Sequence, residues 1–200
     1  WTDQVSGLCA GNWSVLITDA LGCDTTWAFT LLPYTPIVDN AIISDVQCNG
    51  ACDGTVETAA TGGIGTLTYD WQPVPPNGQG TASATDLCPG AYTLVIADAA
   101  GCDSTFSYTI TEPPALQFSL DALTDASCAD AADGLIATTA FGGVPPYAFA
   151  WTGPGGFSAT SEDITGLTPG DHLLRLADAN NCPTDTTLPV GALTTVIADA

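Results

Sequence analysis

The residues with the most distinctive chemistry in this sequence are its 8 cysteines, which recur at nearly constant intervals. The interval from Cys48 to Cys128 is the same as that from Cys102 to Cys182. Because the sequence holds one histidine and no Cys-x-x-Cys motif, this spacing favours disulfides over a metal site. Disulfides persist in oxidising surroundings, so we expect an exported, extracellular protein.

The same interval relates other features of the chain, which therefore consists of repeats. We expect the C-terminal part of a first repeat at 1–37, a complete second repeat at 38–114, a complete third repeat at 115–192 and the first strand of a following repeat at 193–200. The period, about 80 residues, is too long for a solenoid and favours separate domains, each with its own core. We expect the sequence to be a window from a longer array.

Spacing within the repeats predicts how the cysteines pair. In each complete repeat two cysteines stand at the same separation, and for these we expect the bridges Cys48–Cys102 and Cys128–Cys182. Cys52 and Cys88 occur together in the second repeat and are replaced together by Ala132 and Thr168 in the third, which indicates a bridge Cys52–Cys88. The cysteines that would need partners upstream are Cys9 and Cys23. Free buried thiols are the alternative interpretation.

Strand-type alternation dominates each repeat. Tyr92, Leu94 and Ile96 fall on one side of a segment that is polar or small on the other, and Trp71 and Trp151 occupy equivalent inward positions in another segment. Short alternating segments separated by Gly, Pro, Asn and Asp are typical of sandwiches. The sequence predicts an all-β protein of tandem immunoglobulin-like β-sandwich domains of about 80 residues.

A turn that contains an aspartate and a cysteine occurs in all three repeats. Its aspartates are Asp19, Asp98 and Asp178, and Asp103 follows the cysteine of the second copy. Converging carboxylates and carbonyls at domain joints can bind calcium, which is one interpretation of the pattern. The other is that each aspartate accepts hydrogen bonds from its own turn and needs no ion, and no motif of the D-x-D-x-D-G kind is present.

The composition excludes several functions. With 22 acidic residues, 1 cationic residue and a formal charge of −21, the chain lacks the cations that would bind nucleic acid or an anionic membrane surface. No apolar run is long enough for a transmembrane helix, so we expect no direct membrane insertion. The single histidine, His172, aligns with Trp13 and Tyr92 as a strand residue, and no nucleophile motif is present, so we expect no enzyme. The aromatic residues could line a sugar-binding face, but their inward positions favour core packing.

The order of motifs in the second repeat resembles the SprB-type repeat. The motifs are Cys48-Asn-Gly, Asp53-Gly54, Gly62-Gly63, Tyr69-Asp-Trp71, Leu87-Cys-Pro-Gly90-Ala-Tyr92, Asp98-Ala-Ala-Gly-Cys102 and Ile110-Thr-Glu-Pro113, and the third repeat adds "GGVPPYAFAW" at 142–151. The resemblance implies a giant cell-surface protein of gliding and related Bacteroidota, exported by the type IX system. Such proteins act as adhesins or surface filaments. The chain departs from the pattern at Asn181, which replaces glycine before Cys182, and at the additional Cys52 and Cys88.

A motif of Asp, then Ser or Thr, then Thr follows the aspartate turn of every repeat and resembles the O-glycosylation signal of Bacteroidota. The resemblance implies glycans at Thr25, Ser104 and Thr186. Sugar on an exposed edge strand would prevent its pairing with another chain. The alternative is that these residues are ordinary strand-favouring threonines and serines.

Together these patterns predict a non-enzymatic, cell-surface repeat region. We expect a semi-rigid, disulfide-stapled stalk of a bacterial adhesin, with short proline-containing joints at 34–36 and 113–114. The alternative is a structural subunit of a self-assembling filament or sheath. The expected partners are neighbouring repeats, surface glycans or other cell-surface material and, for the alternative, further copies of the chain, with no cofactor except calcium if the turns bind it.

Overall fold

The computed structural model describes residue 8 and residues 11–193 of the 200. Two expectations lie outside the described residues: the upstream disulfide partner of Cys9, and the part of a further strand at 194–200. The described chain divides into two compact units. The first comprises the described parts of Trp1–Ile42, Glu57–Ala84 and Tyr92–Ser107, and the second those of Ile43–Val56, Thr85–Ala91 and Tyr108–Ala200.

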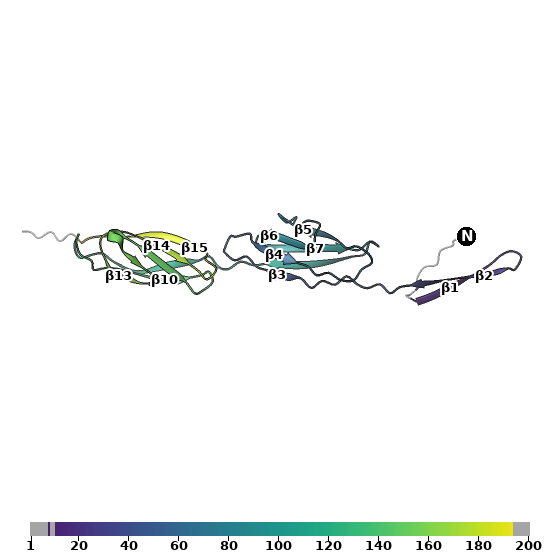
Figure 1. Ribbon diagram of the computed structural model, residues 1–200. Coiled ribbons are helices and arrows are strands. Elements are labelled where there is room, and N and C mark those ends of the chain that lie inside the picture. The colour runs from purple at the N-terminus through teal and green to yellow at the C-terminus, as the bar shows by residue number, and fades with distance from the viewer. Residues whose placement is uncertain (1–7, 9–10, 194–200) are drawn as a thin grey trace, which may run out of the picture. The chain divides into compact units, whose positions relative to one another are not determined.

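The third repeat is a complete β-sandwich within the second compact unit. One sheet has the order β13-β10-β9 and the other the order β12-β11-β14-β15. The short 3-10 helix η1 lies between β11 and β12 along the chain. The bounds are β9 Gln117–Thr124, β10 Gly134–Phe141, β11 Ala148–Thr152, η1 Pro154–Gly156, β12 Ser158–Ala159, β13 Ile164–Leu167, β14 Gly170–Ala177 and β15 Pro183–Val190. Figure 1 shows the layer of β14 and β15 facing the layer of β10 and β13.

Both sheets contribute side chains to one core in this repeat. Ile136 on β10 packs in the same cluster as Trp151 on β11 and Leu174 on β14, and all are at most 1% exposed. The Trp151 indole N–H donates to the Ser161 carbonyl at 3.1 Å, so the ring is buried with its polar atom bonded. The expected all-β sandwich with a central tryptophan is confirmed.

The second repeat has sheets β3-β4-β6 and β5-β7-β8, which match the order of the third repeat except that its described residues form no strand equivalent to β12. Their bounds are β3 Ile42–Ser44, β4 Gly54–Glu57, β5 Thr68–Gln72, β6 Ser83–Leu87, β7 Gly90–Ala97 and β8 Asp103–Ile110. Leu94 and Ile96 on β7 are fully buried, as the alternating pattern predicts. Trp71 is also fully buried and donates to the Thr81 carbonyl at 2.9 Å, matching Trp151.

Within its described residues, the first repeat contributes the antiparallel hairpin of β1 (Gly11–Thr18) and β2 (Asp24–Leu31). Trp13, Val15 and Ile17, which align with buried residues of the later repeats, are 38%, 39% and 51% exposed. The expected inward face is therefore not buried, because the described part of this repeat contains no second sheet to cover it. No helix among the described residues has the length and apolar character needed to span a membrane.

Candidate functional site

The aspartate of the third turn binds backbone N–H groups through both of its carboxylate oxygens. Oδ1 of Asp178 accepts from the N–H groups of Asn180 and Cys182, both at 2.9 Å. Oδ2 accepts from the N–H of Val144 at 2.9 Å, which lies 34 residues earlier in the chain. Asp178 is only 4% exposed, so these bonds take the place of water. The carboxylate thus joins its own turn to the segment after Gly142-Gly143.

The second repeat repeats this geometry. Asp98 accepts at Oδ1 from Ala100 and Cys102 and at Oδ2 from Ile64, each at 2.9 Å. In the first repeat, Asp19 accepts from Leu21 at 2.8 Å and Cys23 at 2.9 Å. All three aspartates thus accept hydrogen bonds from their own turns, and Asp103 is exposed. Among residues 8 and 11–193, no group of three or more His, Cys, Asp or Glu side chains is arranged to hold a metal.

These bonds lower the pKa of both buried aspartates below the ordinary value of 3.8. For Asp98 the N–H of Cys102 lowers the pKa most, burial raises it, and the other N–H groups of the turn and of Ile64 lower it further. For Asp178 burial is the largest single influence and raises the pKa, but the N–H groups of Cys182, Val144 and Asn180 together outweigh it. Both side chains therefore stabilise the fold as carboxylates.

The Gly-Gly pair next to the aspartate turn holds the linker that leads into the third repeat. The N–H of Gly143 donates to the Pro114 carbonyl at 2.8 Å. Gly142 has φ +74° and lies so close to the linker that a Cβ there would overlap the Ala115 carbonyl oxygen. We call these residues, 114–115 with 142–143 and Asp178, the linker clamp of the third repeat. The structure thus gives a role to the Gly-Gly motif that the sequence analysis left unassigned.

An equivalent linker clamp lies at the start of the second repeat, within the first compact unit. The N–H of Gly63 donates to the Thr35 carbonyl at 2.8 Å, and a Cβ on Gly62, at φ +91°, would overlap the Pro36 carbonyl oxygen. Asp98 completes the clamp through its bond from Ile64. Two successive linkers are therefore held by the same three elements.

At the second linker, a loop of the second repeat meets the aspartate turn of the third. Cys48 in this loop is bonded to Cys182 in the turn, with a Cα–Cα distance of 5.6 Å. The Asn180 side-chain amide donates to the Gln47 carbonyl at 2.8 Å, and that of Asn49 donates to the Pro113 carbonyl at 3.0 Å. We call this arrangement the inter-repeat junction.

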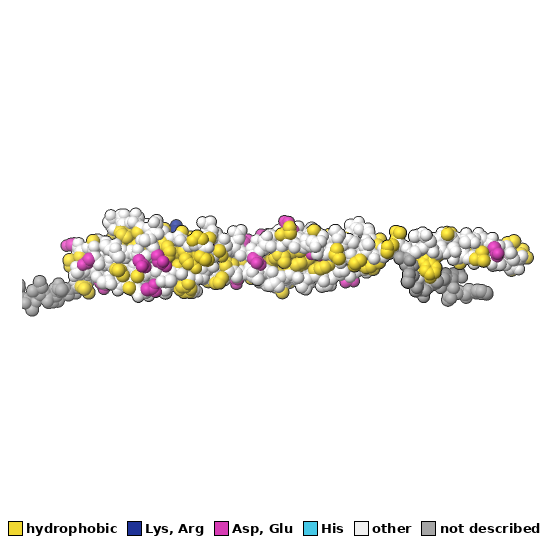
Figure 2. Space-filling model, turned by 90° about the horizontal axis from the view of Figure 1, so that it is seen from below, with side chains coloured by type: hydrophobic (Ala, Val, Ile, Leu, Met, Phe, Trp, Pro, Cys, Tyr) yellow, Lys and Arg dark blue, Asp and Glu magenta, His cyan; other side chains and the backbone are white. Residues whose placement is uncertain are grey.

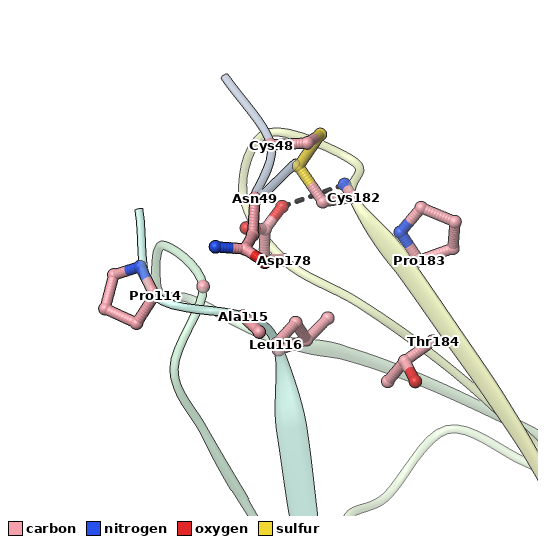
Figure 3. A pocket seen from close by; sticks show the side chains of 10 residues that line it. Cys48, Asn49, Pro114, Ala115, Leu116, Asp178, Cys182, Pro183 and Thr184 are labelled. Carbon is pink, nitrogen blue, oxygen red and sulfur yellow. Dashed lines mark hydrogen bonds between the residues drawn. A yellow bond between two sulfur atoms is a disulfide. The ribbon is translucent and has the colours of Figure 1, made fainter. Parts of the chain in front are cut away.

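A half-open hollow of about 230 Å³ lies at the inter-repeat junction. Figure 3 shows the Asp178 side chain between the disulfide and the linker residues Ala115 and Leu116. The lining of the hollow also includes Asn49 and Thr184. The Asp178 carboxylate in this hollow is already bonded to three backbone donors, so it joins the walls of the junction.

The bridge Cys48–Cys182 corrects the expected pairings Cys48–Cys102 and Cys128–Cys182. In the third repeat, the N–H of Ala126 donates to the Gly191 carbonyl at 3.0 Å, so the Cys128 loop lies at the end of β15, whereas Cys182 lies at its beginning. The eight residues of β15 span roughly 26 Å, far beyond the reach of a disulfide. β8 separates Cys102 from the Cys48 loop in the same way.

Strand length was the signal that could have revealed this. The two cysteines that recur at one separation in each repeat lie at opposite ends of its last strand. The Cys48 loop lies at the end of the second domain that is next to the third, and there it faces the Cys182 turn of the third domain. The structure does contain the other expected bridge, Cys52–Cys88, between the segment before β4 and the end of β6. Among the described cysteines, the free thiols are those of Cys23, Cys102 and Cys128, and all three are exposed.

The remaining candidate residues lie on strands. Thr25 on β2 is exposed, whereas Ser104 on β8 and Thr186 on β15 are half-buried, and the following Thr105 and Thr187 are exposed. His172 is fully buried on β14, with Nδ1 3.1 Å from the Gly170 carbonyl and its ring edge-on to Phe157. His172 is thus a core residue at the position equivalent to Tyr92, which is 7% exposed.

Replacing Asp178 by asparagine should lower the melting temperature at pH 7 by about 5 to 10 °C. An amide nitrogen cannot accept a hydrogen bond, so one of three N–H donors, from Val144, Asn180 or Cys182, would be left unpaired. Because the folded-state pKa is lowered, the wild-type contribution is complete above about pH 4 and is lost as pH falls through the folded pKa. Melting curves at pH 3 and pH 7 should therefore differ less for the variant than for the wild type.

The control for this prediction is Asp171→Asn, because Asp171 is exposed and its replacement removes the same charge. It relieves repulsion in a chain of charge −21 without unpairing a buried donor, so the melting temperature should not fall. Equal melting temperatures for the two variants would contradict the role given to Asp178.

Comparison with known proteins finds one family and several structures. The sequence model of the SprB repeat matches residues 40–75 and 120–156, one segment in each complete repeat. No curated protein matches the sequence. Similar solved structures include the N-terminal eight Ig domains of Down Syndrome Cell Adhesion Molecule (13% identity, 92% of this chain and 28% of that chain, TM-score 0.44). A second is Sidekick-1 immunoglobulin domains 1–5 (13% identity, 92% of this chain and 45% of that chain, TM-score 0.35). A third is a C-terminal fragment of intimin bound to the intimin-binding domain of its receptor (12% identity, 78% of this chain and 64% of that chain, TM-score 0.41). The chain thus spans less than two thirds of each of these structures.

Proposed function

Starting from the two segments that match the SprB repeat, we propose that this chain is a non-enzymatic part of a large bacterial cell-surface adhesin and that its repeats form a semi-rigid stalk. The observation that carries the proposal is the disulfide between Cys48 of one repeat and Cys182 of the next. A protein whose successive domains are cross-linked at their joint transmits force and keeps direction along its length. This is the property that a stalk needs.

The inter-repeat junction restrains the two repeats through more than the peptide linker. The disulfide is a second covalent connection, and the linker clamp holds Pro114 through the N–H of Gly143 at 2.8 Å. The Gly50 N–H also donates to the Glu112 carboxylate at 2.6 Å, which binds the Cys48 loop to the segment just before the linker. Two covalent paths and several hydrogen bonds oppose bending and twisting at this joint far better than a single flexible linker.

The charge of the chain supports separate stalks over tight lateral packing. The only cationic side chain, Arg175, is paired with Asp185 across β14 and β15 at 3.0 Å. Figure 2 shows acidic side chains scattered over the visible face, with apolar and uncharged side chains between them. At −21, neighbouring chains repel each other and stay soluble.

Location and modification complete the proposal. The disulfides support an extracellular, oxidising environment, which agrees with export of SprB-type proteins to the cell surface. Glycans at Thr25, Ser104 and Thr186 remain part of the proposal, and attachment at the half-buried Ser104 and Thr186 requires their side chains to turn outward. An intact mass of native material equal to that of the polypeptide would reject glycosylation.

A filament or sheath subunit is the second candidate, and exposed apolar side chains favour it. Trp27 on β2 is 68% exposed, and Leu21 in the same hairpin is 90% exposed. An apolar surface of this kind can bind a second chain. We rank this function lower because the described residues of this repeat include no second sheet. The apolar side chains of the hairpin are therefore exposed for lack of a covering sheet, which is not evidence for a second chain.

Small-angle scattering of the oxidised chain tests the stalk. A compact protein of 200 residues has a radius of gyration of about 16 Å, and we expect a clearly larger value, above about 20 Å, with an elongated distance distribution. A radius of gyration equal to that of a compact protein would overturn the stalk. Electron microscopy of the native protein separates the two candidates: single thin fibres rooted in the envelope support the adhesin, and ordered multi-chain filaments support the alternative.

A further inference from the structure

The loop that carries Cys48 has a close copy in the third repeat. In the second repeat, the Ala51 N–H donates to the Cys48 carbonyl at 3.0 Å. In the third, the Ala131 N–H donates to the Cys128 carbonyl at 3.1 Å. Each loop is also closed by an aspartate: Asp53 accepts from the N–H of Gln47 at 3.1 Å, and Asp133 accepts from that of Ser127 at 2.9 Å. Cys128 is therefore presented by the same loop structure as the bonded Cys48, yet it is free and exposed.

The turn that carries Cys182 has a close copy in the second repeat. The Asp98 N–H donates to the Cys102 carbonyl at 2.9 Å, and the Asp178 N–H donates to the Cys182 carbonyl at 3.2 Å. Both cysteine N–H groups donate to the turn aspartate at 2.9 Å. Cys102 is free and exposed. Each complete repeat thus has one loop cysteine and one turn cysteine in matching scaffolds.

We propose that Cys128 and Cys102 are sites of further inter-repeat disulfides of the Cys48–Cys182 kind. Cys128 would bond to the turn cysteine of a following repeat, and Cys102 to the loop cysteine of a preceding one. The inference rests on the proposed function, since it requires an array of such repeats. It makes the stalk a continuous disulfide ladder in which every joint has two covalent connections.

The linker clamps support this assignment at Cys102. The clamp around Thr35-Pro36 is formed as completely as the one around Pro114-Ala115, and Asp98 belongs both to that clamp and to the turn of Cys102. The turn cysteine is therefore fixed beside a held linker in both repeats. Ala100 is the residue of the second repeat that is equivalent to Asn180, whose side-chain amide donates to the Gln47 carbonyl. Because alanine has no amide to donate, the joint before the second repeat lacks this contact and depends more on its disulfide.

Bond formation has a simple redox balance. Two thiols lose two protons and two electrons to form one S–S bond, and the electrons pass to a disulfide oxidant that is reduced to two thiols. Oxidised glutathione supplies this oxidant in the test below. The exposure of Cys102 and Cys128 lets such an oxidant and a partner thiol reach them.

The test replaces residues 193–200 by a second copy of residues 113–192, so that a repeat follows the third one at the spacing of the existing linker. The added copy carries the exposed Thr187→Ser change, which marks its turn-cysteine peptide by mass, and Cys128→Ser, so that the third repeat supplies the one loop cysteine of this sequence that can react. After oxidation with a glutathione buffer, unreduced peptide mapping should find Cys128 joined to the marked peptide. Alkylation of Cys128 should fall more than tenfold relative to the unextended chain.

A matched extension whose turn cysteine is replaced by serine should leave Cys128 fully reactive. If the added repeat folds, as judged by its melting transition, and Cys128 still reacts as in the unextended chain, the ladder is wrong. That result leaves the stalk standing, because the stalk depends on the Cys48–Cys182 bridge in the unextended chain. Absence of that bridge from the same maps would instead overturn the proposed function.

Discussion

Pulled between its two ends, the oxidised chain should extend far less than the oxidised Cys48→Ser variant, by about 330 Å. The bridge between Cys48 and Cys182 removes 134 residues from the path that carries the force. At about 3.4 Å for each extended residue, these residues hide about 450 Å, of which the Cys48→Ser change alone releases about 330 Å. In the variant, the Cys52–Cys88 bridge still hides 36 residues, so full reduction should release about 120 Å more. Single-molecule force spectroscopy measures these lengths directly.

The control for this prediction is the Cys52→Ser, Cys88→Ser double variant. Both residues lie inside the loop closed by Cys48 and Cys182, so their bridge does not lie on the shortest covalent path. The oxidised double variant should therefore extend as little as the oxidised wild type. If the wild type and Cys48→Ser reach the same final length, the inter-repeat bridge does not form and the stalk loses its main support.

Replacing Gly142 by alanine should open the linker clamp and lower the melting temperature of the third repeat by more than about 10 °C. The new Cβ would overlap the Ala115 carbonyl oxygen, and alanine is also strained at φ +74°. The linker would have to move away, breaking the bond from the Gly143 N–H to the Pro114 carbonyl. Limited proteolysis near 113–116 should therefore become faster, while the Cys48–Cys182 bridge keeps the cleaved chain together until it is reduced.

Gly155→Ala is the matched control because Gly155 also has a positive φ, +65°, but no atom lies within 4 Å of a Cβ placed there. This variant bears the backbone strain alone, for which we expect a fall of about 5 °C and no change in proteolysis at the linker. A similar fall in both variants would show that strain, and not contact with the linker, explains the glycine at 142.

The sequence by itself determined the features that depend on local pattern. Alternation along 92–96 and the paired tryptophans Trp71 and Trp151 predicted buried strand positions, because side chains on a strand point to alternate faces. The recurrence of Asp98 and Asp178 before a cysteine identified the turn positions and offered self-capping as one of two interpretations, because such a bond is made within a few residues. The presence of Cys52 and Cys88 together in the second repeat, and their replacement together in the third, also identified the Cys52–Cys88 bridge.

Only the tertiary structure decided which cysteines join the repeats and why the Gly-Gly pairs are needed. Spacing alone could not place Cys48 and Cys102 at opposite ends of β8, nor bring Cys182 of the next repeat to Cys48. The contact of Gly142 with Ala115 likewise joins segments that are far apart in the chain. A disulfide forms between cysteines whose Cα atoms come within about 7 Å, and that distance depends on which domain ends meet, whereas sequence separation measures only the chain between them.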